Sequence, residues 1–177
     1  MLKPDSLRAA LTAAIADLRT DPKRLNMFID KGSIRATAAP GLSFEYRYKL
    51  QLLLLDFAGH PDQVMVPLIA WLFVHQNELL ANPDKSRDGI GFNAEMLDGG
   101  RVDLEIELAL TERVRVQRRE DGGFDVTHMP EPPVEERYDI DQDADGNAIA
   151  RLWHLFNGGE EMLRWESPGI ITAYPPA

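Results

Sequence analysis

The clearest feature of the sequence is an alternation of apolar and polar residues between Phe44 and Leu52. Because successive side chains of a β-strand point to opposite faces, this alternation predicts a long strand with one buried face. From Leu53 onward the other face also becomes apolar, with Leu55 and Phe57. We therefore expect the far half of the strand to be covered on both sides. The apolar positions of the first face are Phe44, Tyr46, Tyr48, Leu50, Leu52 and Leu54.

A second alternation predicts a long strand over residues 102–116, preceded by a shorter strand over residues 92–96. The turn residues Asp98, Gly99 and Gly100 lie between the two strands, so we expect a hairpin. A further turn at 121–123 precedes a short β-segment at 124–127. Inward positions of the long strand are Val102, Leu104, Ile106, Leu108 and Leu110, and its outward positions include Asp103, Glu105 and Glu107.

Helical spacing of apolar residues predicts two main helices, at about 4–20 and 62–80. The first begins at Pro4, a residue favoured in the first turn of a helix, and Pro67 falls in the first turns of the second. Between the first helix and the long strand, a short β-prone segment at 27–30 meets a turn expected at Lys31 and Gly32. A polar loop is expected at 81–91.

The last third of the chain predicts a separate extension. Prolines at 130, 132 and 133 break regular structure, and two short β-segments at about 148–166 flank a turn at 157–159. A two-stranded ribbon is marginal alone, so we expect it to dock on the main domain or on a partner through Trp153, Phe156 and Trp165. The fold prediction is therefore an α+β domain with a mixed or antiparallel sheet over 1–128, an acidic linker over 129–147 and a C-terminal hairpin over 148–177.

Charge and composition restrict the possible functions. The formal net charge is −10, and residues 120–147 hold ten acidic side chains against Arg137 as the one lysine or arginine. This distribution lacks the basic footprint of a sequence-reading nucleic-acid binder. The chain has no cysteine, which excludes disulfides and thiolate metal sites. The longest apolar run, at 64–74, is too short to cross a bilayer, and we see no signal peptide.

No arrangement of residues predicts catalysis or a resident cofactor. The best metal candidate is an acidic stretch with Asp141, Asp143 and Asp145, which matches the opening of an EF-hand calcium loop. Leu152 stands where that loop needs a bidentate glutamate, so a solvated acidic turn is favoured. Two of the outward carboxylates Asp103, Glu105 and Glu107 could form the paired-carboxylate site of a glycoside hydrolase. An exposed strand face rich in carboxylates explains these residues better. The histidines, at 60, 75, 128 and 154, have no zinc-ligand spacing.

Five separate segments carry a resemblance to a known family. They occur in order and at family-like spacing over about residues 1–118, and they are 1–8 (MLKPDSLR), 32–34 (GSI), 42–48 (LSFEYRY), 66–72 (VPLIAWL) and 110–113 (LTER). Together they resemble the tail completion protein R family of Peduovirus-type, contractile-tailed phages. The resemblance implies a structural virion protein that finishes the tail at its head-proximal end and allows head–tail joining, after assembly in the host cytoplasm. It implies no enzyme activity and no membrane partner.

The resemblance also suggests kinship with tail terminators, and hence a homohexameric ring. Its partners would be tail tube or sheath proteins and the head–tail connector, with DNA only as passing cargo. We take Arg113, Arg115 and the three C-terminal aromatic residues as interface candidates, and Asp103, Glu105 and Glu107 as carboxylates that face a central channel. Two alternatives remain open from the residues alone: a calcium-dependent binding module, and an acidic DNA mimic that inhibits a nucleic-acid enzyme.

Overall fold

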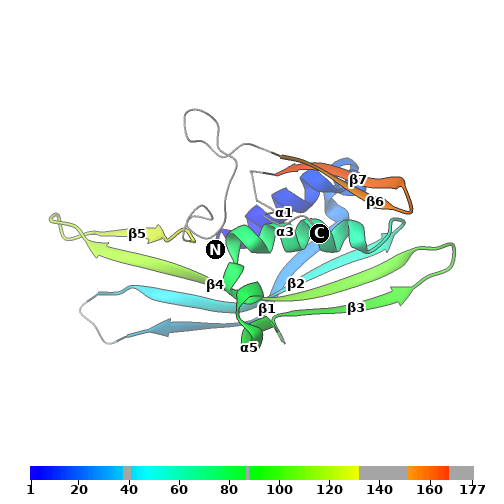
Figure 1. Cartoon of the computed structure of the whole chain (residues 1–177). Coiled ribbons are helices and arrows are strands. Elements are labelled where there is room, and N and C mark those ends of the chain that lie inside the picture. The colour runs from blue at the N-terminus through cyan, green and yellow to red at the C-terminus, as the bar shows by residue number, and fades with distance from the viewer. Residues whose placement is uncertain (38–40, 87, 132–150, 168–177) are drawn as a thin grey trace.

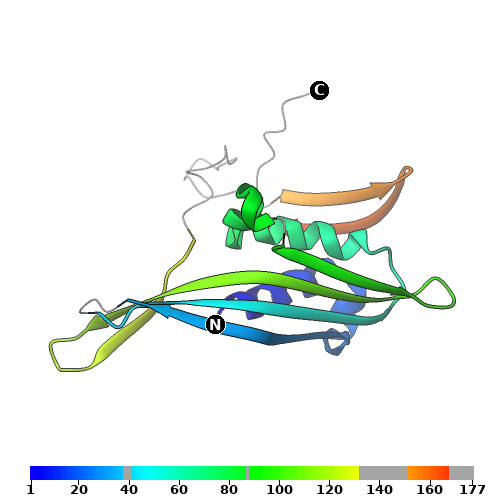
Figure 2. The same ribbon diagram turned by 90° about the horizontal axis from the view of Figure 1, so that it is seen from below.

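The computed structural model describes residues 1–37, 41–86, 88–131 and 151–167. A five-stranded antiparallel sheet in the order β1-β2-β4-β3, with β5 paired to β4, carries helices on one face (Figure 1). Seen from below, the sheet lies in front of α1 and its other face has no helical layer (Figure 2). The predicted α+β class with an antiparallel sheet is confirmed. The elements are α1 (Lys3–Ala14), α2 (Ala16–Thr20), η1 (Pro22–Arg24), β1 (Leu25–Ala36), β2 (Phe44–Phe57), α3 (Asp62–His75), α4 (Asn77–Ala81), α5 (Pro83–Ser86), β3 (Ile90–Met96), β4 (Val102–Arg118), β5 (Phe124–His128), β6 (Arg151–Asn157) and β7 (Glu160–Ser167).

The core lies between the helices and the even-numbered side chains of β2 and β4. Leu50 pairs with Leu108 across the two strands, and Leu52 pairs with Ile106. Each of these side chains is at most 1% exposed, which stabilises the fold by about 1.5–3 kcal/mol per side chain. The alternation read from the sequence is confirmed in both strands. The helices cover this layer with Leu7, Leu11 and Leu18 from the N-terminal segment and Val64, Leu68, Trp71 and Leu72 from α3.

Both predicted long helices are interrupted by one residue. Ile15 has an extended backbone that separates α1 from α2, yet its amide still donates to the Leu11 carbonyl at 2.9 Å. The break places Ile15 itself in the core, 3% exposed. Gln76 separates α3 from α4 in the same way, with φ −151° and ψ 46°. Helix α3 begins at Asp62, so Pro67 lies in its early turns as expected.

The predicted turn at Lys31 and Gly32 is wrong, because β1 continues to Ala36 along the whole of its neighbour β2. A register shift between Ile29 and Lys31 absorbs one residue, and Gly32 then lies opposite Tyr48 in the ladder. Residues 31–36 are extended because they pair with residues 44–49 of the long strand β2. The loop expected at 81–91 also differs, since it contains α5 and ends where β3 begins at Ile90.

The expectation that the end of β2 is covered on both sides is also wrong. Asp56 has a positive φ of 54°, and the pairing with β4 shifts between Leu54 and Phe57. This bulge turns Phe57 to the helix side, where it is 1% exposed, and leaves Leu55 43% exposed on the other side. Phe57 therefore joins the core on the helix side, while Leu53 and Leu55 lie on the outer face.

The two-stranded ribbon predicted near the C-terminus is present as β6 and β7. Its turn has glycines with positive φ, 57° at Gly158 and 95° at Gly159, which glycine adopts without strain. Leu163 is 7% exposed in the main core, and Gln63 donates to the Met162 carbonyl at 2.6 Å. The ribbon thus docks on the helical layer, next to α1 and α3 (Figure 1).

Candidate interaction surfaces

The three outward carboxylates of β4 lie together on the uncovered face of the sheet, half-buried among the neighbouring strands. Each has a partner. The Asp103 carboxylate accepts the Asp56 amide at 2.6 Å, and Glu105 accepts the side-chain amide of Asn93 at 3.3 Å. Glu107 binds the Lys49 ammonium and accepts the Gln51 side-chain amide at 2.8 Å. Lys49 holds the pKa of Glu107 below its ordinary value, so this carboxylate is locally neutralised.

Basic residues gather at the opposite end of the same face. We call this end the arm, formed by residues 31–36, 44–47 and 112–118 together with β5. Arg113 and Arg115 are exposed there and border a shallow groove of about 500 Å³ with Arg35, which the sequence analysis did not connect to them. The ladder aligns Arg35, Glu45 and Arg113 in one row across three strands. The outer face is thus basic at the arm and acidic toward the β3–β4 hairpin.

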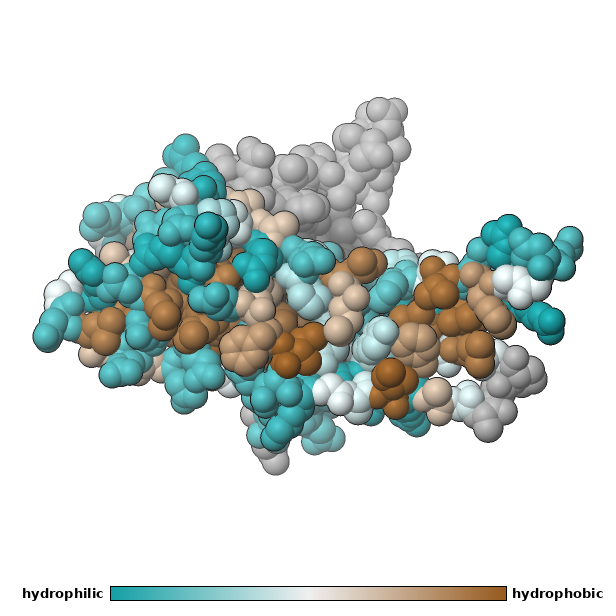
Figure 3. Space-filling view, turned by 180° about the vertical axis from the view of Figure 1, so that it is seen from behind, coloured by the Kyte–Doolittle hydropathy of each residue, from teal (hydrophilic) through white to brown (hydrophobic). Residues whose placement is uncertain are grey.

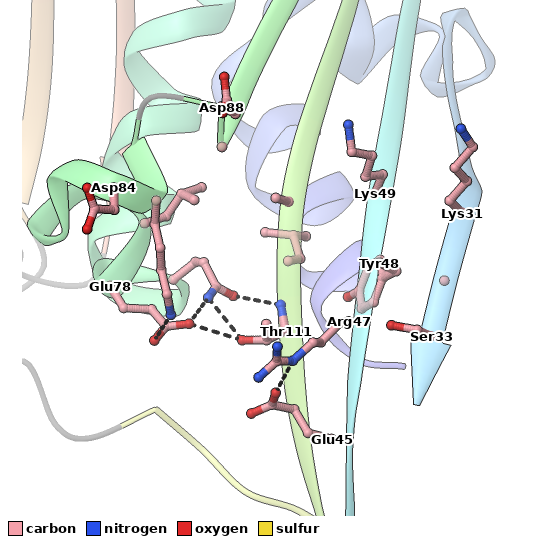
Figure 4. A pocket seen from close by; sticks show the side chains of 17 residues that line it. Lys31, Ser33, Glu45, Arg47, Tyr48, Lys49, Glu78, Asp84, Asp88 and Thr111 are labelled. Carbon is pink, nitrogen blue, oxygen red and sulfur yellow. Dashed lines mark hydrogen bonds and ion pairs between the residues drawn. The ribbon is translucent and has the colours of Figure 1, made fainter. Parts of the chain in front are cut away.

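A larger cavity of about 590 Å³ opens between the middle of this face and the segment α4–α5 (Figure 4). Lys31, Lys49 and Arg47 stand on the sheet side, and Glu78 and Asp84 stand on the helical side. A large part of this charge is already paired within the molecule, because Arg47 binds Glu45 at 2.5 Å and Glu78 binds Lys85 at 2.8 Å. Because charged side chains of both signs line it, the cavity suits polar contact with another macromolecule.

Glu112 is a buried carboxylate, 5% exposed, that the sequence analysis did not single out. It accepts the Tyr48 hydroxyl at 2.5 Å and the Leu2 amide at 2.8 Å, and the His128 ring lies 3.1 Å away. Leu2 precedes α1 and has no polar side chain, so Glu112 caps this helix from the sheet. Burial raises the pKa of Glu112, but the hydrogen bonds from Tyr48 and from the backbone of Leu2 and Lys3 outweigh it and leave the pKa below its ordinary value.

Gln76 fills a gap along the edge of β4 opposite β2, between the stretches that pair with β3 and β5. Its side-chain oxygen accepts the Thr111 amide at 3.1 Å and the Lys3 ammonium at 2.7 Å. Its side-chain nitrogen donates to the Thr111 hydroxyl at 3.1 Å. The same Lys3 binds Glu131 at 2.8 Å. Gln76 and Glu112 together tie the helical layer, the sheet and the segment after β5 into one body.

Large apolar side chains are exposed where the sheet extends beyond the helices. Figure 3, seen from behind, shows hydrophobic side chains gathered along the arm up to its polar tip. Phe124 is 52% exposed there and Val126 is 62% exposed. A second group lies on β3, where Phe92 is 64% exposed and Met96 is 75% exposed. Exposed apolar side chains gathered in this way are typical of surfaces that bind other proteins.

The C-terminal aromatic residues were expected to dock the ribbon on the main domain or on a partner. Phe156 is 56% exposed, and the ribbon contacts the main domain through Leu163. Trp153 pairs with Trp165 in the backbone register of β6 and β7, and the contacts of their side chains lie outside the described part of the chain. Phe156 therefore remains a candidate contact to a partner.

The calcium-loop candidates Asp141, Asp143 and Asp145 lie outside the described residues. Within the ranges described, no group of three or more histidine, aspartate or glutamate residues is arranged to hold a metal ion. Among the described helices, none is long and apolar enough to span a bilayer.

Comparison with known proteins agrees with this description. The sequence profile of the family described as P2 phage tail completion protein R (GpR) matches residues 1–132. The chain is also 38% identical over 166 residues to tail completion protein R of Escherichia phage P2, covering 94% of this chain and 99% of that protein. No solved structure matches. The chain therefore belongs to the tail completion protein R family of P2-type phages, a family of structural tail proteins.

Proposed function

We propose that this protein completes the phage tail at its head-proximal end, as a closed homohexameric ring that allows a DNA-filled head to join. The observation that carries the proposal is the family match over residues 1–132, together with 38% identity to tail completion protein R. In this role the protein performs no catalysis. Its partners are further copies of itself, tail tube or sheath proteins and the connector of the head, and assembly takes place in the host cytoplasm.

The structure supports a ring subunit in two ways. A closed ring uses two different surfaces of each subunit, and the molecule presents exposed apolar groups at two separate places, on the arm and on β3. The uncovered sheet face carries charged side chains along most of its length, with Phe28 and Leu55 as exposed apolar residues among them, which suits a surface that lines a water-filled channel. The arginines of the arm disfavour the alternative of a DNA mimic, because such a protein presents a continuous negative surface.

The experiment that tests the proposal is loss and restoration of the protein during phage growth. Phage that lack it should leave filled heads beside unjoined tails, and supplying the intact chain should restore complete particles. Electron microscopy of the lysates and the solution mass of the purified protein give the two readouts. Joined particles in the absence of the protein would overturn the role in completion. If the purified protein has the mass of a monomer in solution and is also bound to tails as a monomer, the proposal of a ring is wrong.

We further propose that Asp103 and Glu105 face the channel of this ring and keep passing DNA from adhering. Negative charge near a channel wall repels DNA phosphates, and Glu107 contributes less because Lys49 binds it. Changing Glu105→Lys should leave ring assembly intact and slow the release of DNA from assembled particles. Glu120→Lys, in the exposed turn before β5, is the matched control for net charge. Equal rates of DNA release in the two variants would show that Glu105 does not line the channel.

A further inference from the structure

The sheet has two open edges at opposite ends of its strand order. β1 pairs with β2 and β3 pairs with β4, and among the described residues neither has a strand on its other side. Every residue from 30 to 36 of β1 and from 91 to 96 of β3 is exposed. An unpaired edge presents a row of backbone donors and acceptors that another strand can complete. Natural monomers usually protect such edges, so two long unprotected edges point to a partner.

The side chains on the two edges complement each other. On the helix side, β1 exposes Ile34 to 63%, while β3 exposes Phe92 to 64% and Met96 to 75%. On the outer side, β1 carries Lys31 and Arg35, in line with Lys49 and Glu45 of β2. The outer side of β3 carries Asn93 and Glu95, in line with Glu105 and Asp103 of β4. Apolar residues thus meet apolar residues, and basic residues meet acidic ones, if the two edges come together.

We propose that the edge of β3 in one copy pairs antiparallel with residues 31–36 of β1 in a second copy, with Ser33 opposite Asn93. This inference rests on the ring proposed above and names its interface. In this register Lys31 lies opposite Glu95 and Ile34 lies opposite Phe92, while Gly32 meets Ala94. Arg35 lies opposite Gly91, whose neighbour across the existing ladder is Glu107. Glycine at 91 leaves the space through which the guanidinium reaches that carboxylate.

The strand directions of a cyclic ring agree with this pairing. Within one subunit, each strand is antiparallel to the next along the order β1-β2-β4-β3, so β1 and β3 run in opposite directions. Rotation about a ring axis preserves the direction of every strand along that axis. β3 of one subunit therefore meets β1 of the next as an antiparallel neighbour. The contact is head-to-tail, and it closes after a fixed number of copies.

The absence of cysteine from the chain allows a direct test by disulfide cross-linking. The two single variants Ser33→Cys and Asn93→Cys are purified, mixed and oxidised under mild conditions. Residues directly opposite in an antiparallel pair have Cα atoms about 4.5–5.5 Å apart, which a disulfide spans without strain. We expect covalent dimers in the mixture and at least about tenfold fewer in either variant alone, since a heterologous contact never joins two identical positions.

The control for the register is Asn26→Cys mixed with Asn93→Cys. Asn26 and Asn93 lie in the same row across the sheet, through Leu53 and Glu105, so an unstaggered contact between the edges would bring them together. Cross-links in this mixture and not with Ser33→Cys would overturn the proposed register. Cross-links in Asn93→Cys alone would overturn the head-to-tail arrangement. If no mixture cross-links while the solution mass is that of a hexamer, the ring stands and this interface is wrong.

A charge exchange gives a second, independent readout. Lys31→Glu and Glu95→Lys should each raise the dissociation constant of assembly about twofold to fivefold, because each places like charges opposite one another. The double variant restores opposite charges in every contact and should assemble like the unaltered chain. Both positions are exposed, so folding is not at stake. A double variant that assembles no better than the single variants would refute the pairing of Lys31 with Glu95.

Discussion

At the residue scale, Glu112 is a buried polar group with a large predicted effect on stability. Changing Glu112→Gln keeps its size but replaces one acceptor oxygen by an amide NH2 group, so that either the Leu2 amide at Oε2 or the Lys3 amide and the Tyr48 hydroxyl at Oε1 lose their acceptor. A buried donor left without an acceptor costs about 1–3 kcal/mol. We expect the free energy of unfolding to fall by about this amount in urea denaturation at pH 7. Glu120→Gln, in an exposed turn, is the matched control and should change it by less than about 0.5 kcal/mol.

The pH dependence of this effect has a definite sign. Because the folded-state pKa of Glu112 lies below its ordinary value of 4.5, the folded protein binds this proton less readily than the unfolded chain does. The stabilisation is therefore complete above the unfolded-state pKa and is lost as the pH falls through the folded-state pKa. We expect the free energy of unfolding of the unaltered chain to fall below about pH 4.5, and to fall more steeply with pH than that of Glu112→Gln. Parallel curves for both proteins would contradict this assignment.

Asp56 offers a test of backbone strain at the bulge that ends β2. Its φ of 54° lies in the left-handed region, where glycine fits and alanine is strained by about 1 kcal/mol. Its carboxylate also binds Arg101 at 2.7 Å, and both Asp56→Gly and Asp56→Ala remove that pair equally. We expect Asp56→Ala to be the less stable variant by about 1 kcal/mol in thermal denaturation. Equal stabilities would mean that the backbone at this position relaxes.

At the scale of elements, Gln76 substitutes for a missing strand beside β4. Changing Gln76→Leu leaves the Thr111 amide without its acceptor and should cost about 1–3 kcal/mol. The effect should be local, so hydrogen exchange of the Thr111 amide should accelerate far more than that of Leu108, which pairs with both β2 and β3. Uniform acceleration along β4 would show that Gln76 acts through global stability alone.

The sequence predicts those elements whose residues alternate over a long distance. The buried faces of β2 and β4 follow from the two-residue period, because a hydrophobic face along a strand is a local property of the chain. The hairpin turn before β4, at 98–100, follows equally from its glycines. The outward position of Asp103, Glu105 and Glu107 was predictable on the same ground.

Features fixed by contacts distant in sequence were not predictable. The extended backbone at Ile15 depends on the packing of α1 against the sheet, and β1 extends beyond Lys31 because β2 is available beside it. Glu112 lies 110 residues from the amide of Leu2 that it accepts, and no local pattern relates the two. The groove of Arg35, Arg113 and Arg115 likewise exists only once three strands are aligned.

At the scale of the whole molecule, the net charge is −10, but positive and negative side chains gather at opposite ends of the outer sheet face. The outer face is basic at the arm, through Arg35, Arg113 and Arg115, and acidic near the β3–β4 hairpin, through Glu95, Asp103 and Glu105. Two copies with such a face would attract one another head-to-tail and repel one another head-to-head, as the proposed ring requires. In the ring proposed above, this charge distribution would select the orientation of neighbouring subunits.

In the C-terminal ribbon, one residue packs on the main domain and another is free to contact a partner, so the two roles can be tested separately. Leu163 is buried and Phe156 is 56% exposed on the same ribbon. Leu163→Ala should lower the free energy of unfolding by about 2–4 kcal/mol, because it removes core packing. Phe156→Ala should leave stability unchanged within about 0.5 kcal/mol.

If the ribbon contacts another component of the particle, Phe156→Ala should nevertheless reduce the yield of complete particles when it replaces the unaltered protein during phage growth. Exposed aromatic residues of this kind supply much of the binding energy of an interface. Plaque yield beside a denaturation curve of the same variant separates the two effects. A normal yield from Phe156→Ala, with a reduced yield from Leu163→Ala, would make the ribbon a stabilising cover for the helices and leave the arm and β3 as the surfaces for partners.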